Sequence, residues 1–183
     1  MLITKKDIRL EMARRKRALS VEHKNIASED LCRQLLSDRK IQNAKVILLY
    51  NALPDEISLA PLLDFLYKKE NPPTLLLPIV KGKELELKIY QGLNSLQLGA
   101  YGILEPTGEV FTEYSNIEIA IIPGVAFNQS GVRVGRGKGF YDRLLPHLTE
   151  SYKIGVCFPC QLVENLPSEA HDVPMDTIVV PKD

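Results

Sequence analysis

The segment Pro123-Gly-Val-Ala-Phe-Asn-Gln-Ser-Gly-Val-Arg-Val-Gly-Arg-Gly-Lys-Gly-Phe-Tyr-Asp-Arg143 joins an apolar run, residues 117–122, to a helical pattern over residues 139–148. A buried strand followed by a glycine-rich loop and a helix is typical of α/β folds, and it sets the loop at a helix N-terminus, where anions are favoured. We expect the loop glycines to adopt positive φ and to let backbone N–H groups approach a ligand. These glycines are Gly131, Gly135, Gly137 and Gly139.

Basic residues alternate with the glycines, and this alternation predicts a polyphosphate site. Arg133, Arg136 and Lys138 supply positive charge beside the backbone N–H groups, which together form an anion-binding nest. Asp142 offers a hard oxygen ligand for the magnesium ion that accompanies a nucleotide. A flexible glycine turn with solvated charges is the alternative, and the regular alternation favours the phosphate interpretation.

The loop matches neither of the two common nucleotide-binding patterns. The Walker pattern requires Ser or Thr after Gly-Lys, and here Gly137-Lys138 is followed by Gly139. The dinucleotide fingerprint requires G-x-G-x-x-G, whereas the loop reads G-x-G-x-G. The phosphate hypothesis therefore depends on the loop's own chemistry.

Hydrophobic periodicity predicts alternating helices and strands along the chain. Thr4 and Ser20 precede the first two helices, the second of which reaches about Leu36, and a further helix covers residues 61–68. Strands are predicted at residues 46–50, 74–80, 85–90, 117–122, 152–158 and 177–180. The alternation indicates one α/β domain over residues 1–183, of three-layer type, with a mainly parallel sheet flanked by helices. Ligands of such sheets bind beyond the carboxyl ends of the strands.

Composition narrows the class of protein. Lys plus Arg and Asp plus Glu both number 23 among 183 residues, which argues against a dedicated nucleic-acid-binding protein. No apolar stretch is long enough to cross a bilayer and the N-terminus is charged, so we expect a cytoplasmic protein without a membrane partner.

The three cysteines fit a reducing compartment. Cys157 and Cys160 have C-x-x-C spacing, which is compatible with a thioredoxin-like pair or with half of a zinc site. However, a second C-x-x-C is missing and the three histidines are scattered singly, while structural zinc needs four ligands. Buried thiols at a strand end are therefore favoured, together with Cys32 as a reduced thiol.

The central segment resembles the signature of the 5-formyltetrahydrofolate cyclo-ligase family, also called methenyltetrahydrofolate synthetases. Further elements similar to that family occur in the same order along nearly the whole chain: Lys5-Lys-Asp-Ile-Arg9, Asn51-Ala-Leu-Pro-Asp-Glu-Ile57, Tyr101-Gly-Ile-Leu-Glu-Pro106, Gly155-Val-Cys-Phe158 with Gln161, and His171-Asp172 with Asp176. Two positions depart from the pattern. Phe140 stands where many members have tyrosine, and Asn128 stands where aspartate is common.

The resemblance implies an enzyme that converts 5-formyltetrahydrofolate to 5,10-methenyltetrahydrofolate with ATP and Mg²⁺, releasing ADP and phosphate. ATP would phosphorylate the formyl oxygen, and cyclisation would follow. The implied partners are small molecules, the reduced folate and ATP, and we expect a monomer. A non-catalytic nucleotide- and folate-binding module on the same fold is the alternative, which the presence of every candidate catalytic residue type disfavours. Another sugar-phosphate or acyl-transfer enzyme would not need the triply basic loop.

The resemblance also implies site residues. The catalytic candidates are Arg136, Lys138 and Tyr141. The ATP-binding candidates are Lys5, Lys6, Asp7, Ile8, Arg9, Arg133, Val134, Gly135, Arg136, Gly137, Lys138, Gly139, Phe140 and Tyr141. The substrate-binding candidates are Asn51, Glu56, Arg136, Gly137, Lys138, Gly139 and Phe140, and the metal candidates are Asp142 and Asp172. Taken alone, Lys5 and Arg9 fit solvated helix positions. The basic run at residues 14–17 fits a solvated face, or a surface that attracts a polyanionic folate tail.

Overall fold

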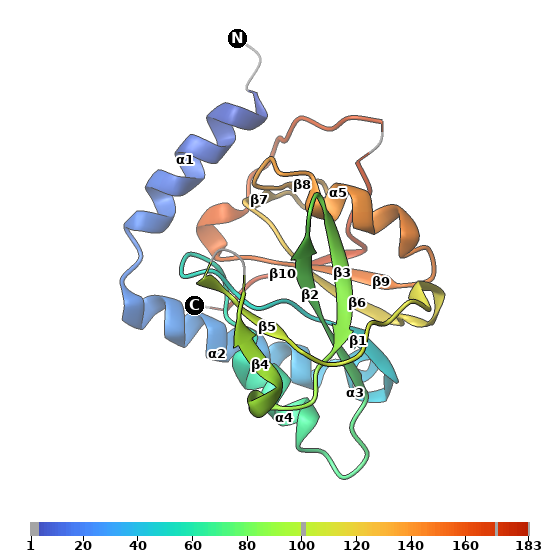
Figure 1. Ribbon diagram of the computed structural model, residues 1–183. Helices are drawn as coiled ribbons and strands as arrows, with labels where there is room; N and C mark the ends of the chain where they lie inside the picture. The colour runs from blue at the N-terminus through green and yellow to red at the C-terminus, as the bar shows by residue number, and fades with distance from the viewer. Residues whose placement is uncertain (1–3, 100–101, 171, 183) are drawn as a thin grey trace.

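The computed structural model describes residues 4–99, 102–170 and 172–182, and within them a six-stranded sheet forms the centre of the molecule (Figure 1). The strand order is β10-β9-β6-β1-β2-β3, and every neighbouring pair is parallel except β2 with β3. The strands are β1 (Val46–Leu48), β2 (Thr74–Lys81), β3 (Glu84–Ile89), β6 (Ile119–Pro123), β9 (Tyr152–Val156) and β10 (Thr177–Val179). The predicted mainly parallel α/β fold is confirmed. Tyr101 and His171, which belong to two of the family-like elements, lie outside the described residues.

Helices cover both faces of the sheet because successive strand residues point to opposite sides. In β6, Ile119 and Ile121 pack with buried side chains of α2 (Val21–Ser37), α3 (Arg39–Asn43) and α4 (Ala60–Tyr67). The intervening Ala120 and Ile122 pack with α5 (Phe140–Leu144) and the 3₁₀ turn η4 (Leu145–His147) on the other face. Figure 1 shows the resulting three layers.

Helix α1 (Lys5–Arg17) attaches to the segment that leads to the glycine loop. Its N-terminus is closed by a capping box, in which the Thr4 side chain accepts from the Asp7 N–H and the Asp7 carboxylate accepts from the Thr4 N–H at 3.0 Å. Ile8 and Met12 are buried, and they pack in one cluster with Val134. The apolar stripe of α1 therefore anchors the proposed ATP-binding helix beside the loop.

Two small hairpins are absent from the sequence prediction. They are β4 (Leu96–Leu98) with β5 (Leu104–Pro106), and β7 (Ala126–Phe127) with β8 (Arg133–Val134). Strands of two or three residues are too short to show a period. The β7–β8 hairpin contains Gly131 in its turn and separates β6 from the other loop glycines, Gly135, Gly137 and Gly139. The Asn128 side chain holds the turn by accepting from the N–H groups of Ser130 at 3.1 Å and Val132 at 2.9 Å.

The loop glycines are not equivalent. Gly131, Gly137 and Gly139 have positive φ, as expected, but Gly135 does not, so the expectation was wrong at this position. A side chain at Gly135 would instead meet the guanidinium of Arg133, which fills the space above it.

Among the residues that the structure describes, no helix is long and apolar enough to span a membrane. The cytoplasmic location, the monomeric state, the lack of a nucleic-acid partner and the extent of the domain over residues 1–183 stay predictions.

Gly131→Ala should lower the free energy of unfolding far more than Gly82→Ala. Both glycines have positive φ (82° and 64°), which costs an alanine about 1–2 kcal/mol. A Cβ at Gly131 would also collide with the carbonyl oxygen of Met175, whose N–H donates to the Gly131 carbonyl at 2.9 Å, whereas a Cβ at Gly82 meets no described atom within 4 Å. We expect a further loss of about 1–3 kcal/mol at Gly131 alone. Urea unfolding of the two variants measures the difference, and equal losses would contradict the close approach of these two segments.

Candidate active site

A cavity of about 330 Å³ opens at the carboxyl ends of β1 and β6. The chain leaves β1 toward β2 on one side and β6 toward β9 on the other, so the cavity lies where the strand order reverses. Tyr50 and Asn51 follow β1, and Pro123 and Gly124 stand at the end of β6; all four line the cavity. This is the edge of the sheet at which the sequence predicted ligand binding.

Most residues predicted from the loop meet in this cavity. The predicted site residues that line it are Asn51, Glu56, Arg133, Gly135, Arg136, Gly137, Lys138, Gly139, Phe140, Tyr141 and Asp142. The lining also contains residues that sequence reasoning missed: Tyr50, Leu53, Pro78, Val80, Leu85, Ile103, Glu105, Pro123 and Gly124. Several of these belong to strands, and in sequence a strand residue that faces a cavity looks the same as a core residue.

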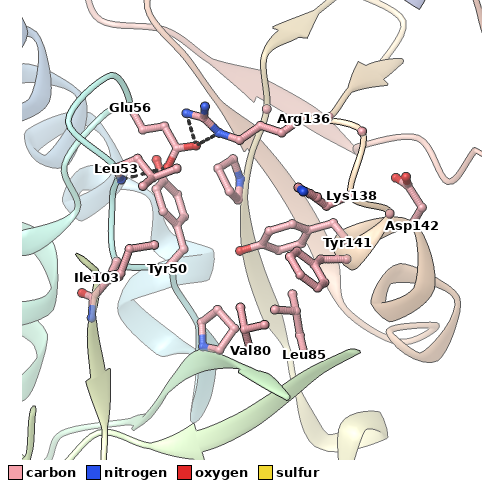
Figure 2. A pocket seen from close by; sticks show the side chains of 18 of the residues that line it. Tyr50, Leu53, Glu56, Val80, Leu85, Ile103, Arg136, Lys138, Tyr141 and Asp142 are labelled. Carbon is pink, nitrogen blue, oxygen red and sulfur yellow. Dashed lines mark hydrogen bonds and ion pairs between the residues drawn. The ribbon is translucent and has the colours of Figure 1, made fainter. Parts of the chain in front are cut away.

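The cavity has a polar side and an apolar side (Figure 2). Arg136 and Glu56 face each other across one edge, and Val80 and Leu85 from the β2–β3 hairpin form an apolar wall. The hydroxyl of Tyr141 points into the cavity between them. Burial, with the nearby charge of Glu56, raises the pKa of Tyr141 above its ordinary value, so this phenol stays protonated at neutral pH.

Arg136 contacts two carboxylates of the segment after β1. Its Nε donates to Glu56 Oε1 at 2.9 Å and its Nη2 donates to Asp55 Oδ1 at 2.5 Å. The other oxygen of Glu56 accepts from the Leu53 N–H at 3.1 Å. The candidate for phosphate chemistry and the candidate for folate binding are therefore hydrogen-bonded to each other. Asp55 was not predicted as a site residue, although it lies in the family-like element at residues 51–57, directly before Glu56.

Asp55 also binds a buried lysine of α1. Lys16 is 4% exposed, and its ammonium donates to Asp55 Oδ2 at 2.5 Å and to the Asp55 carbonyl at 3.0 Å. Burial raises the pKa of Asp55, but the hydrogen bonds from Lys16 and Arg136 outweigh it, and the pKa lies below its ordinary value. The expectation of a solvated basic run is thus wrong for Lys16. Arg14 and Arg15 of the same run pair with Glu11.

Arg133 and Asp142 form a second pair at the base of the loop. Arg133 is 8% exposed and donates to an oxygen of Asp142 and to the Pro123 carbonyl. Burial lowers the pKa of Arg133, and the charge of Asp142 opposes that shift. Lys138, by contrast, is exposed at the cavity and makes no ion pair with any residue that the structure describes.

The N-terminal candidates lie outside the cavity lining, and Arg9 is the one that contacts the glycine loop through a hydrogen bond within the described residues. Arg9 Nε donates to the Gly135 carbonyl at 2.7 Å, which ties α1 to the loop. Lys5 forms ion pairs with Asp172 at 2.9 Å and Glu169 at 3.1 Å, so an ATP candidate and a metal candidate bind each other.

The remaining N-terminal candidates differ in their surroundings. The side chains of Ile8 and Val134 belong to the core, and Asp7 caps its own helix. Lys6 is exposed. The side chains of Ile8, Val134 and Asp7 thus have structural roles. Contacts of these residues and of Lys6 with ATP stay predictions.

The carboxylates at the cavity suit a magnesium ion that takes most of its ligands from a bound substrate. Within the described ranges, no group of three or more His, Cys, Asp or Glu side chains could hold a metal ion. Magnesium is commonly bound through one or two carboxylates, with phosphates and water completing the shell. Asp142 fits this role because its side chain is 42% exposed and lines the cavity.

The cysteines are free thiols. Burial raises the pKa of Cys157 to about 12 and that of Cys32 to about 11. Redox-active C-x-x-C pairs have the opposite property, a lowered pKa that supplies a thiolate. The buried-thiol interpretation of Cys157 is therefore favoured.

A mainly parallel sheet with a basic glycine loop and a half-apolar cavity at its switch point is an arrangement in which α/β proteins commonly place ligand sites. Comparison with known proteins specifies the family within this class of α/β proteins. The sequence profile of the 5-formyltetrahydrofolate cyclo-ligase family matches residues 3–181, and the chain therefore belongs to this family.

Individual relatives agree with the family assignment. The 5-formyltetrahydrofolate cyclo-ligase of Haemophilus influenzae is 31% identical over 182 residues, covering 96% of this chain and 97% of its own, and that of Escherichia coli K12 is 30% identical over 174 residues, covering 91% and 94%. The solved structure of 5,10-methenyltetrahydrofolate synthetase from Aquifex aeolicus superposes with a TM-score of 0.85 at 33% identity, covering 98% of this chain and 93% of that one.

Thiol labelling of the native protein should modify Cys160 first. Burial raises the pKa of all three thiols, but Cys160 is partly exposed whereas Cys157 and Cys32 are buried. A raised pKa keeps a thiol protonated until the pH approaches that value, so at pH 8 neither buried cysteine supplies a thiolate. Reaction with an aromatic disulfide reagent, followed by peptide mass spectrometry, measures the order. Rapid formation of a disulfide between Cys157 and Cys160 would contradict this account.

Proposed function

We propose that the protein converts 5-formyltetrahydrofolate to 5,10-methenyltetrahydrofolate at the expense of ATP, with Mg²⁺, releasing ADP and phosphate. Membership of the cyclo-ligase family supports the overall reaction. The observation that carries the proposal is the contact between Arg136 and Glu56, because it joins a phosphate-binding loop to a carboxylate suited to a folate ring within one cavity.

The reaction needs activation because a formamide carbon is a poor electrophile and its oxygen is a poor leaving group. In the proposed mechanism the formyl oxygen attacks the γ-phosphorus of ATP, and the bond to ADP breaks. Nitrogen-10 of the folate then attacks the formyl carbon, the C–O bond breaks with release of phosphate, and nitrogen-10 loses its proton. The protein mainly aligns the reactants and stabilises charge, as in other phosphoryl transfers.

The loop residues would act on the transferring phosphoryl group. Arg136 and Lys138 would stabilise its negative charge, since both line the cavity and Lys138 is exposed there. Backbone N–H groups of the loop would bind the remaining phosphates. Arg9 would act from α1 by holding the Gly135 carbonyl and with it the conformation of the loop.

The opposite side of the cavity would bind the folate. Glu56 can accept two N–H bonds in one plane, which suits the donor edge of a pterin ring. Val80 and Leu85 would cover the apolar faces, and Phe140 would stack on the ring. Tyr141, a phenol that is protonated at neutral pH, would donate a hydrogen bond to the substrate near the formyl group.

Magnesium would be held together with ATP by Asp142 Oδ2, which has no hydrogen-bond partner among the described residues. When bound, the ion would neutralise phosphate charge. Asp142 also faces buried Arg133, so its negative charge serves the protein as well. The pairing of Asp172 with Lys5 favours a role in which Asp172 fixes the Lys5 side chain at the start of α1.

Purified protein mixed with 5-formyltetrahydrofolate, ATP and Mg²⁺ should form the methenyl product, and Arg136→Ala should reduce kcat/KM by about 10²–10³-fold, the typical effect of removing one charge-stabilising donor. Arg33→Ala is the matched control, since Arg33 is an exposed arginine of α2 that also has an acidic partner. Product absorbance gives the rates. Binding of both ligands by correctly folded wild-type protein without turnover would favour the non-catalytic alternative.

Asp142→Asn should raise the Mg²⁺ concentration needed for half-maximal rate, and EDTA should stop turnover of the wild type. The substitution removes a charged oxygen ligand while keeping the shape of the side chain. Thermal unfolding must accompany the assay, because Arg133 loses its carboxylate partner in this variant. An unchanged Mg²⁺ dependence in a folded Asp142→Asn variant would rule out Asp142 as a ligand.

A further inference from the structure

Four charged side chains form a continuous chain of ion pairs from α1 to the glycine loop. Lys16 binds Asp55, Asp55 binds Arg136, and Arg136 binds Glu56, with N–O distances of 2.5, 2.5 and 2.9 Å. Glu56 and Arg136 line the cavity, whereas Lys16 and Asp55 stand behind them, outside its lining. Lys16 and Asp55 therefore have no direct contact with a ligand in the cavity, and the reason for their pairing has to be sought elsewhere.

Lys16 fixes Asp55 at two points. The ammonium is bound both to the carboxylate and to the backbone carbonyl of Asp55, so side chain and main chain are held together. Burying an ammonium group is costly unless its partners are well placed, and here Lys16 is 4% exposed. Such an arrangement makes Asp55 a rigid acceptor on a segment that otherwise has no regular structure.

Asp55 in turn fixes the plane of the Arg136 guanidinium. The two oxygens of Asp55 are divided, one for Lys16 and one for Arg136 Nη2, while Glu56 accepts from Arg136 Nε. A planar guanidinium bound through two different nitrogens can neither rotate nor swing away. The Arg136 side chain is 41% exposed and would be mobile without these bonds.

The orientation leaves one donor group available. Within the described part of the chain, Nη1 of Arg136 makes no hydrogen bond. A guanidinium held by its other edge presents this nitrogen for an anion.

We propose that Asp55, anchored by buried Lys16, is a positioning residue that orients Arg136 for the polyphosphate of the nucleotide. The proposal rests on the proposed function of Arg136 and adds to it a pair of residues behind the site. Asp55 itself touches no substrate. Its substitution should therefore act only through Arg136.

The test measures binding of adenylyl imidodiphosphate with Mg²⁺ by calorimetry, alongside steady-state rates of methenyl formation. Asp55→Asn should weaken analogue binding about tenfold and lower kcat/KM for ATP by about 10- to 100-fold, the range expected when a catalytic group is misplaced. Binding of 5-formyltetrahydrofolate without nucleotide should change less than twofold. Asp64→Asn is the control, because Asp64 pairs with Lys68 at 2.8 Å on the exposed face of α4.

Two further variants separate positioning from stability. Asp55→Asn leaves the buried ammonium of Lys16 without its carboxylate and should lower the unfolding temperature. The double variant Lys16→Met/Asp55→Asn removes both charges, so its unfolding temperature should return toward the wild-type value. Its analogue binding should stay as weak as that of Asp55→Asn. In an Arg136→Ala background, Asp55→Asn should change analogue affinity less than twofold, because the residue through which it acts is gone.

The outcomes distinguish this proposal from the proposed function. If the wild type forms product but a folded Asp55→Asn variant binds the analogue and turns over as the wild type does, the positioning role is contradicted and the proposed reaction is not. An equal loss from Asp55→Asn with and without Arg136 contradicts the positioning role as well. Analogue binding that depends on Asp55 without any methenyl formation contradicts the proposed reaction and supports the positioning role. A wild type that neither binds the analogue nor forms product contradicts both.

Discussion

The parallel pairing of β1 with β6 positions everything at the cavity. Ile47 pairs with Ile119 and Leu48 with Ala120, so both strands end at the same edge of the sheet. From this edge the chain after β1 carries the acidic segment, and the chain after β6 leads through a hairpin to the glycine loop. Two segments about eighty residues apart in the sequence are thereby brought together, and Arg136 donates a hydrogen bond to Glu56. The apolar strands set this register because a shift by one residue would turn every strand side chain to the wrong face.

Two buried cations at or behind the cavity are each paired with a carboxylate. Arg133 is paired with Asp142, and Lys16 with Asp55, and in each pair the cation is less than a tenth exposed. Replacing such pairs by apolar residues is often neutral or stabilising, so they are weak contributors to stability as such. Their value lies in geometry: each holds a group that faces the cavity, Asp142 in one case and Arg136 in the other. The fold thus holds two partly exposed charged groups of the site in place through buried cations.

Much of this arrangement could be predicted from the sequence. The caps at Thr4 and Ser20, the buried strands and the phosphate-type loop all depend on local signals, and the structure has a helix or strand at each predicted place. The burial of Lys16 could not be predicted, because a lysine within a basic run shows no local sign of its distant partner Asp55. The apolar wall of Val80 and Leu85 was missed for a similar reason, since only the tertiary arrangement separates a cavity from the core. Gly135 shows that glycine can be needed for space beside Arg133 where positive φ is not required.

The central claim is that one cavity brings the terminal phosphate of ATP to the formyl oxygen of the folate. The most direct measurement uses 5-formyltetrahydrofolate labelled with ¹⁸O in the formyl group and follows the label by mass spectrometry of the released phosphate. Phosphorylation of that oxygen predicts one ¹⁸O atom in each phosphate formed during a single turnover. Unlabelled phosphate, with the label recovered in water, would contradict the account.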